Sequence, residues 1–214
     1  MNSYKTPIGD LQVEVFGHSS VLFRLENKRI YLDPYSDVCS FVGKEPADLI
    51  LITHNHYDHY DKKAFSNIQT SKTIFIVSED VPKVDNRYIV LRNEEACEYE
   101  GIHFKAVPSY NIKKRRADGS LFHPRGLGNG YIMDFGGYKI YIAGDTEFIP
   151  EMRNISNIEI AFLPKDLPYT MSDEEFIMAA NIIKPRYLYP YHYFDLDVTK
   201  LKKFLDLGIT LIDK

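Results

Sequence analysis

Apolar and polar residues alternate through most of the first fifty positions, which is typical of strands buried on one face. The alternation predicts strands over 11–16, 21–25 and 29–33, and Pro34 ends the last of these. Residues 48–53 form a continuous apolar run instead, as expected for a strand that is covered on both faces. The apolar residues that follow recur at helical spacing: Tyr60, Ala64, Phe65 and Ile68.

Strand patterns continue through the middle of the chain. The predicted strands there are 73–77 and 88–91, and residues 97–108 continue in a strand-like pattern up to Pro108. Residues 131–135 and 138–143 flank Gly136-Gly137, and two glycines between alternating stretches are a strong hairpin signal. The middle third therefore consists mainly of strands.

The last third mixes strands with helices. Residues 158–163 predict a strand, and Ser172 with Glu175 predicts a capping box at the start of a helix that Pro185 ends. Residues 187–191 predict a further strand. A last helix is predicted from three apolar positions: Leu201, Phe204 and Leu205.

These elements predict one fold class. Strands come first and last, with helices in each half, so two sheets packed face to face with helices outside would use every element. This is an α/β (α+β) architecture. No linker, repeat or low-complexity stretch divides the chain, so we expect a single domain over residues 1–214.

Composition narrows the class of protein. Lys and Arg total 26 against 30 for Asp and Glu, and the net charge of −4 argues against a dedicated nucleic-acid binder. No apolar run reaches the ~20 residues of a membrane span, and no signal peptide opens the chain. Two cysteines, Cys39 and Cys97, fit a reducing compartment. We expect a cytoplasmic protein with a small-molecule substrate and no membrane or nucleic-acid partner; whether it forms a homo-oligomer stays open.

Histidine is the residue that indicates chemistry. Three of the seven histidines fall within residues 54–59, in the segment His54-Asn-His56-Tyr-Asp58-His59 that follows the continuous apolar strand. Imidazole nitrogens and carboxylate oxygens are ligands of zinc, manganese and iron. Two histidines two positions apart can face one ion, and the aspartate and histidine one turn later can hold a second. The simpler alternative is a polar loop with exposed histidines.

This H-x-H-x-D-H segment resembles the signature of the metallo-β-lactamase-fold hydrolases. The resemblance extends to residues 16–21 and 31–35, to Gly144-Asp145-Thr146, and to Pro190-Tyr-His192. Residues 168–171 before a helix are similar to the branch that contains ascorbate-phosphate lactonase and N-acyl-phosphatidylethanolamine phospholipase D. The resemblance implies a four-layer αββα sandwich.

The resemblance also implies a role for each matching residue. His54 and His56 would bind a first metal ion, whereas Asp58, His59 and His192 would bind a second. Asp145 would bridge the two ions, and Asp33 would orient a ligating imidazole. The cofactor would be one or two divalent ions, most readily zinc, with manganese or iron as alternatives.

The chain departs from the family pattern at one position. Asn111 stands where the family has a third histidine for the first metal, and an amide is a poor zinc ligand. His123, twelve residues later, could replace that ligand; otherwise it binds substrate, or only one metal is bound. His18, Tyr110, Asn111 and His123 are candidates for substrate contacts. His103 is expected to be structural or exposed. A basic run at 113–116 borders these residues and could attract an anion.

The function that fits best is metal-assisted hydrolysis, with Asp58 as the catalytic group that orients the attacking water or takes its proton. The expected substrate is a small anionic ester, lactone or phosphodiester. Three alternatives stay open. They are a nuclease or phosphodiesterase of the tRNA-processing kind, a di-iron oxygenase, and a non-catalytic binding module whose metal site is incomplete. The second is disfavoured because such proteins usually carry a carboxylate where this chain has His56.

Overall fold

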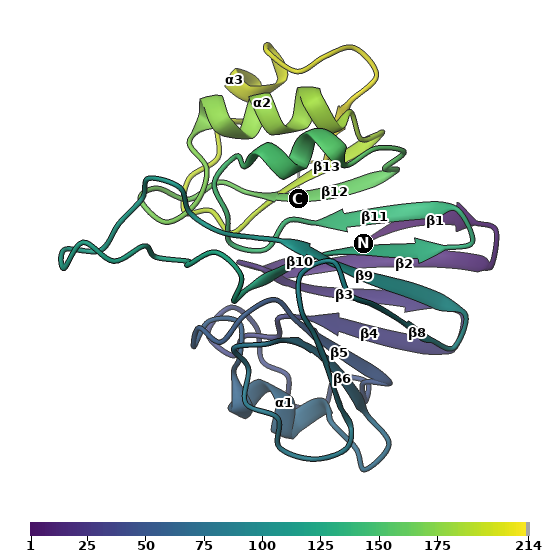
Figure 1. Cartoon of the computed structure of the whole chain (residues 1–214). Coiled ribbons are helices and arrows are strands. Elements are labelled where there is room, and N and C mark those ends of the chain that lie inside the picture. Colours follow the sequence, from purple (N-terminus) through teal and green to yellow (C-terminus); the bar gives the residue numbers. More distant parts are fainter. Residues whose placement is uncertain (213–214) are drawn as a thin grey trace. The chain divides into compact units, whose positions relative to one another are not determined.

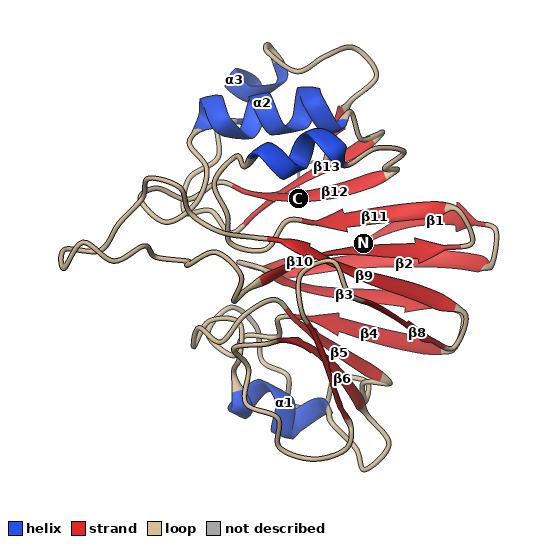
Figure 2. Cartoon of the chain, viewed as in Figure 1, coloured by secondary structure: helices blue, strands red, loops and turns tan. Residues whose placement is uncertain are grey.

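The computed structural model describes residues 1–212. The chain forms two compact units, one of residues 1–92 and one that begins at residue 93. Each unit contains one seven-stranded sheet accompanied by helices (Figure 1, Figure 2). The predicted α/β class is therefore confirmed, whereas a single domain over 1–214 stays a prediction. None of the helices within the described residues is long and apolar enough to cross a membrane.

The sheet of the first unit follows chain order, from β1 to β7. Its first four strands pair antiparallel and its last three continue the sheet in parallel. The strands are β1 Asn2–Thr6, β2 Gly9–Gly17, β3 Ser20–Leu25, β4 Lys28–Leu32, β5 Leu49–Ile52, β6 Ile74–Ser78 and β7 Tyr88–Leu91.

One helix, α1 Lys62–Ile68, accompanies this sheet. Its apolar side chains Ala64, Phe65 and Ile68 share one buried cluster with side chains of β5 and β6. Asp61 caps its N-terminus, since its carboxylate accepts from the backbone N–H groups of Lys63 at 2.8 Å and Ala64 at 3.3 Å. The cap fixes where the chain turns from the histidine segment into the helix.

The strands of the second sheet also follow chain order, from β8 at one edge to β14 at the other. Four strands pair antiparallel, and β12, β13 and β14 then continue from β11 in parallel. The strands are β8 Ala96–Tyr99, β9 Ile102–Pro108, β10 Asn129–Phe135, β11 Tyr138–Ile142, β12 Ile160–Pro164, β13 Tyr187–Tyr191 and β14 Thr210–Leu211. The helices are the 3₁₀ helix η1 Pro150–Asn154, α2 Asp173–Ile183 and α3 Val198–Lys202.

Helix α2 lies against β12 and β13 in this unit (Figure 2). Ser172 and Glu175 form the predicted capping box, and the buried positions of the helix are Phe176, Ala179, Ala180 and Ile183. Lys184 ends the helix in the left-handed region, with φ of 52°. The sequence pattern therefore predicts both ends of this helix correctly.

The strand-like pattern over residues 97–108 is confirmed as a hairpin of β8 and β9, in which Glu100 and Gly101 turn the chain with φ of 48° and 81°. One prediction about the elements is wrong. The last helix ends at Lys202, so Phe204 and Leu205 lie beyond it. Strands β1 and β14 and helix η1 were not predicted, since these short segments carry little periodic signal.

Replacing Asp61 by Ala should lower the free energy of unfolding by about 1–2 kcal/mol. The helix would lose its cap, and the Ser36 N–H, which donates to the same carboxylate at 2.7 Å, would lose its acceptor. Urea unfolding measures the change. Asp197→Ala is the matched control. The Asp197 carboxylate accepts from the Lys200 N–H, so this variant removes the cap of the short helix α3. Equal, negligible losses in both variants would contradict the role given to Asp61.

Candidate functional site

Polar side chains of the first unit gather where two parallel strands end. Asp33 directly follows β4, and Thr53 directly follows β5. Because β4 and β5 run in parallel, their carboxyl ends meet at one edge of the sheet. The Asp33 N–H donates to the Leu51 carbonyl at 3.0 Å, so the two strand ends are joined there.

Asp33 is the fixed point of this group. Its carboxylate is fully buried and accepts from the Thr53 N–H at 2.9 Å and the Thr53 hydroxyl at 2.7 Å. The same carboxylate lies 2.8 Å from Nδ1 of the buried His59. A carboxylate can only accept, so His59 carries its proton on Nδ1 and keeps a lone pair on Nε2. The contact expected between Asp33 and an imidazole is therefore present.

Thr53 orients a second histidine by the same logic. Its only hydroxyl hydrogen is committed to Asp33, so its oxygen can only accept from Nδ1 of His54, 3.0 Å away. The lone pair of His54 is then on Nε2, which faces Nδ1 of His56 at 2.9 Å. One nitrogen of His54 and one of His59 lie within 4.8 Å of each other. The three histidines thus present their rings to a common region.

Asp58 and His18 complete the group in this unit. His18 lies in the turn between β2 and β3 with φ of 49°, and its Nε2 is 2.9 Å from the Asp58 carboxylate. The same carboxylate oxygen lies 3.9 Å from Nε2 of His59. Both Asp58 and His18 are largely but not fully buried, with side chains 17% and 14% exposed. Asp58 is therefore both accessible and held in place.

The second unit gathers its own polar side chains at strand ends. Asp145 lies just beyond β11, Asp166 just beyond β12 and His192 directly after β13, which are neighbouring parallel strands. All three are at least nine-tenths buried. His192 lies between the two carboxylates, with Nε2 at 3.1 Å from Asp145 and Nδ1 at 3.3 Å from Asp166.

Gly144 explains how Asp145 reaches this position. Its φ of +67° is in the left-handed region, and a Cβ there would lie 2.7 Å from both the Asn129 carbonyl and the Ser109 hydroxyl. Ser109 in turn donates to the Asp145 carbonyl at 3.0 Å. Only glycine lets the backbone pass this close, so the Gly-Asp pair is a packing requirement as well as a motif.

His123 lies in the same unit, with Nε2 at 3.2 Å from the Asp145 carboxylate, and Asn111 contacts the other side of its ring. Tyr110 packs into the core of the unit and donates its hydroxyl to Glu151 at 3.0 Å. Burial raises the pKa of that hydroxyl, and the bond to Glu151 raises it further. His103 is exposed on β9, as predicted.

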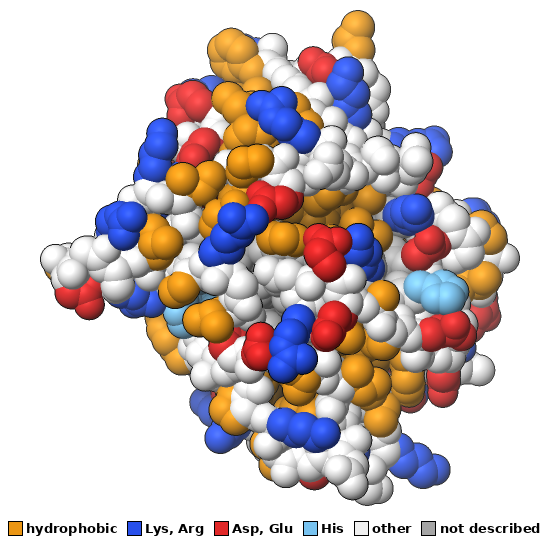
Figure 3. Space-filling model, viewed as in Figure 1, with side chains coloured by type: hydrophobic (Ala, Val, Ile, Leu, Met, Phe, Trp, Pro, Cys, Tyr) orange, Lys and Arg blue, Asp and Glu red, His pale blue; other side chains and the backbone are white. Residues whose placement is uncertain are grey.

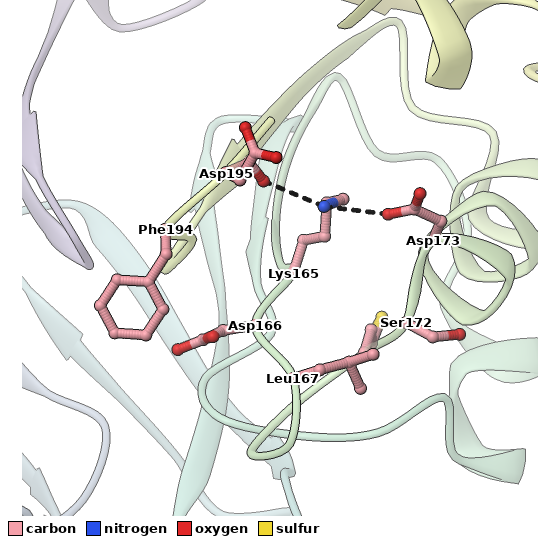
Figure 4. A pocket seen from close by; sticks show the side chains of 8 residues that line it. Lys165, Asp166, Leu167, Ser172, Asp173, Phe194 and Asp195 are labelled. Atoms are coloured by element: carbon pink, nitrogen blue, oxygen red, sulfur yellow. Dashed lines mark hydrogen bonds and ion pairs between the residues drawn. The ribbon is translucent and has the colours of Figure 1, made fainter. Parts of the chain in front are cut away.

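Sequence analysis missed two residues that contact ring nitrogens of the histidines, Thr53 beside His54 and Asp166 beside His192. Thr53 entered only as the last residue of the predicted strand 48–53, and Asp166 was not singled out. Asp166 carries the same signal as Asp33, a carboxylate just after a buried strand. It also lines a cavity of about 200 Å³ with Lys165, Leu167 and Phe194 (Figure 4). In that view the Lys165 amine donates to the Asp195 carbonyl at 3.0 Å and pairs with Asp173 at 2.9 Å.

The donor atoms of these groups fit a divalent metal ion. Every predicted ligand is an imidazole or a carboxylate, the set that zinc, manganese and iron accept. In the second unit, imidazole nitrogens of His123 and His192 approach the same oxygen of Asp145. Atoms with lone pairs repel one another at such distances unless a cation or a proton lies between them.

The comparisons with known proteins agree with these groups. Residues 12–192 match the model of the Beta-lactamase superfamily domain. A UPF0173 metal-dependent hydrolase of Thermoplasma volcanium is 30% identical over 203 residues, which cover 89% of this chain and 87% of that protein. This chain belongs to the metallo-β-lactamase superfamily. It has the metallo-β-lactamase fold and is a metal-dependent hydrolase of the UPF0173 kind.

Solved structures extend the likeness. A Parabacteroides distasonis protein assigned as a metal-dependent hydrolase is 39% identical, with a TM-score of 0.89 and coverage of 99% of this chain and 96% of that one. The di-iron β-hydroxylase CmlA of Streptomyces venezuelae is 15% identical, with a TM-score of 0.70 and coverage of 97% and 53%. The second likeness shows the fold alone. The lactonase and phospholipase branch suggested by sequence stays a prediction.

Replacing Asp33 by Asn should weaken metal binding roughly 10–100-fold, as for other partners of ligating histidines. One acceptor atom would become an N–H₂ group facing the donors of Thr53 or His59, and such a buried mismatch costs about 1–3 kcal/mol of stability. Metal affinity by chelator competition and urea unfolding measure the two effects.

Asp48→Asn is the control for that variant. Asp48 precedes β5 at the other end of the strand and bonds Arg29 instead of a histidine. If Asp33→Asn loses no more metal affinity than Asp48→Asn does, Asp33 has no role in metal binding.

Proposed function

We propose that this metal-dependent hydrolase cleaves a small anionic ester, lactone or phosphodiester. The observation that carries the proposal is the contact between Asp58 and His18 beside His59. It combines a carboxylate that can take a proton with an imidazole that orients that carboxylate, and Nε2 of the neighbouring His59 ring lies 3.9 Å from the same oxygen. Such a pair is the minimum that general-base hydrolysis requires.

A bound divalent ion lowers the pKa of a coordinated water to about 7 and polarises the oxygen of a carbonyl or phosphoryl group. Asp58 orients the attacking water through its carboxylate oxygens and takes a proton from it. His18 donates from Nε2 to that carboxylate at 2.9 Å and so keeps it from rotating away. Asp33 and Thr53 hold the rings of His59 and His54 in the matching tautomers.

We assign the ligands as the sequence suggests. His54 and His56 would serve one ion, Asp58, His59 and His192 would serve a second, Asp145 would bridge, and His123 would supply the missing ligand. Zinc is the preferred metal because nitrogen donors dominate, with manganese or iron as the alternatives. Both cysteines are free, which supports a reducing compartment, and we propose the cytoplasm.

The loop between Asn111 and His123 supports an anionic substrate. Lys113, Lys114, Arg115 and Arg116 lie on it, and it projects from the second unit in Figure 1. Figure 3 shows Lys and Arg side chains along the same projection. Lys114 is paired with Glu175, whereas Arg115 donates to the Gly119 carbonyl within the loop. The basic run thus adds positive charge to a loop that ends at His123, in a chain that is acidic overall.

Asp58→Asn should lower kcat by at least about 100-fold, the usual share of a general base, while leaving the fold intact. Steady-state hydrolysis measured with a metal-loaded sample checks this. Asp37→Asn is the control, because Asp37 is a carboxylate of the same unit that accepts from the Tyr35 hydroxyl at 2.9 Å. If the Asp58 variant keeps the wild-type kcat, Asp58 has no part in catalysis.

The substrate class is tested with panels of lactones, carboxylic esters and phosphodiesters, together with metal analysis of the purified protein. Turnover of one anionic class, lost on chelation and restored by Zn²⁺, is the expected result. Purified protein that binds no metal after reconstitution would overturn the hydrolase proposal. Cleavage restricted to polynucleotides with steep salt dependence would favour a nuclease instead.

A further inference from the structure

Asn111 is a buried amide with every polar atom engaged. Its side chain is 1% exposed and lies at the start of the basic loop, whose other end is His123. The backbone of the two residues is joined, since the Asn111 N–H donates to the His123 carbonyl at 2.8 Å. This amide stands where the family pattern has a histidine, so its role in this chain needs a separate explanation.

The surroundings decide which way the amide points. Its Nδ2 lies 2.8 Å from the Tyr169 carbonyl and 3.4 Å from Glu147. A carbonyl can only accept, and Glu147 already accepts from the backbone N–H groups of Lys113 at 3.0 Å and Lys114 at 2.6 Å. Both neighbours on this side therefore require a donor, which only the N–H₂ group of Asn111 supplies.

The opposite atom, Oδ1, then faces His123. It accepts from the His123 backbone N–H at 2.7 Å and lies 2.7 Å from the ring nitrogen Nδ1. Because Oδ1 has no hydrogen to give, Nδ1 must carry the proton. The lone pair of the neutral ring is then on Nε2, the nitrogen that lies 3.2 Å from the Asp145 carboxylate.

We propose that Asn111 is a positioning residue that holds His123 in the Nδ1–H tautomer, so that His123 replaces the missing histidine as a metal ligand. The metal part of this inference rests on the proposed function, whereas the tautomer part rests on the geometry alone. Asn111 acts through His123 and touches neither metal nor substrate. This assigns the amide a different role from the substrate contact that the sequence suggested.

The partner of His123 differs in kind from those of two other histidines. His59 and His192 each have a carboxylate next to Nδ1, whereas His123 has a neutral amide. A carboxylate partner raises the basicity of a ligating imidazole, and an amide does so less. His123 is therefore a correctly oriented but weaker ligand.

The first test measures the tautomer without any metal. Imidazole ¹⁵N spectra of the metal-free protein, with the His123 signals identified by their loss in His123→Gln, should show Nδ1 protonated and Nε2 unprotonated. Asn111→Leu should move His123 to a mixture or to the other tautomer. Asn111→Asp keeps an acceptor toward Nδ1 and should retain the wild-type tautomer. Its second carboxylate oxygen would face the Tyr169 carbonyl without a hydrogen to donate, so this variant should be less stable.

Asn129→Leu is the matched control, since Asn129 is equally buried in the same unit but bonds Asn93 and the Tyr131 hydroxyl. It should leave the His123 signals unchanged. A wild-type His123 protonated on Nε2, or an Asn111→Leu spectrum identical to that of the control, would overturn the proposal.

The second test measures Zn²⁺ affinity by competition with a chromophoric chelator. Asn111→Leu should bind one Zn²⁺ roughly 10–100-fold more weakly than wild type, with Asn129→Leu close to wild type and Asn111→Asp at least as tight as wild type, because it gives His123 a carboxylate partner. Equal affinity in Asn111→Leu and Asn129→Leu would overturn the metal part of the proposal. If the wild type binds no Zn²⁺, the proposed function fails, and the ¹⁵N spectra still decide whether Asn111 sets the tautomer.

Discussion

A buried group that can only accept hydrogen bonds lies behind His59, and much of the site depends on that constraint. The Asp33 carboxylate accepts hydrogen bonds from the Thr53 hydroxyl and from Nδ1–H of His59 at the same time. From this single carboxylate follow the orientation of Thr53, the tautomer of His54 and the side on which both rings keep a lone pair. Moving a proton within this series of hydrogen bonds would leave a buried donor or acceptor unsatisfied. The arrangement is therefore fixed before any ligand binds.

Parallel strands supply the positions that such a network needs. In each unit, the polar groups lie at the carboxyl ends of neighbouring parallel strands, which bring residues far apart in sequence to one edge of a sheet. Asp33 and Thr53 meet in this way in the first unit, as do Asp166 and His192 in the second. The buried strands provide rigidity, and the residues after them carry the chemistry.

The sequence could predict what depends on local pattern. The H-x-H-x-D-H segment, the glycine hairpin and both ends of α2 carry strong local signals, and the structure has the hairpin and helix where predicted. Asp166 stands just after a predicted strand, but its contact with His192 could not be predicted, because that contact depends on which strands become neighbours. The role of Glu147 depends in the same way on contacts between segments that are far apart in sequence. The hairpin at Glu100 was hidden because a two-residue turn barely interrupts the alternation of its strands. The ligand roles themselves stay predictions, since geometry shows contacts but not a bound ion.

Fold likeness alone does not determine the chemistry of this chain. The di-iron β-hydroxylase CmlA shares the fold at 15% identity, so the fold occurs in a protein named for a different chemistry. The difference must lie in a few residues at the strand ends. His56 gives the first unit three neighbouring imidazoles, and imidazole nitrogen is a donor that divalent metals accept. Asn111 shows how small such a difference is, because it gives the His123 ring a neutral amide partner where His59 and His192 have carboxylates.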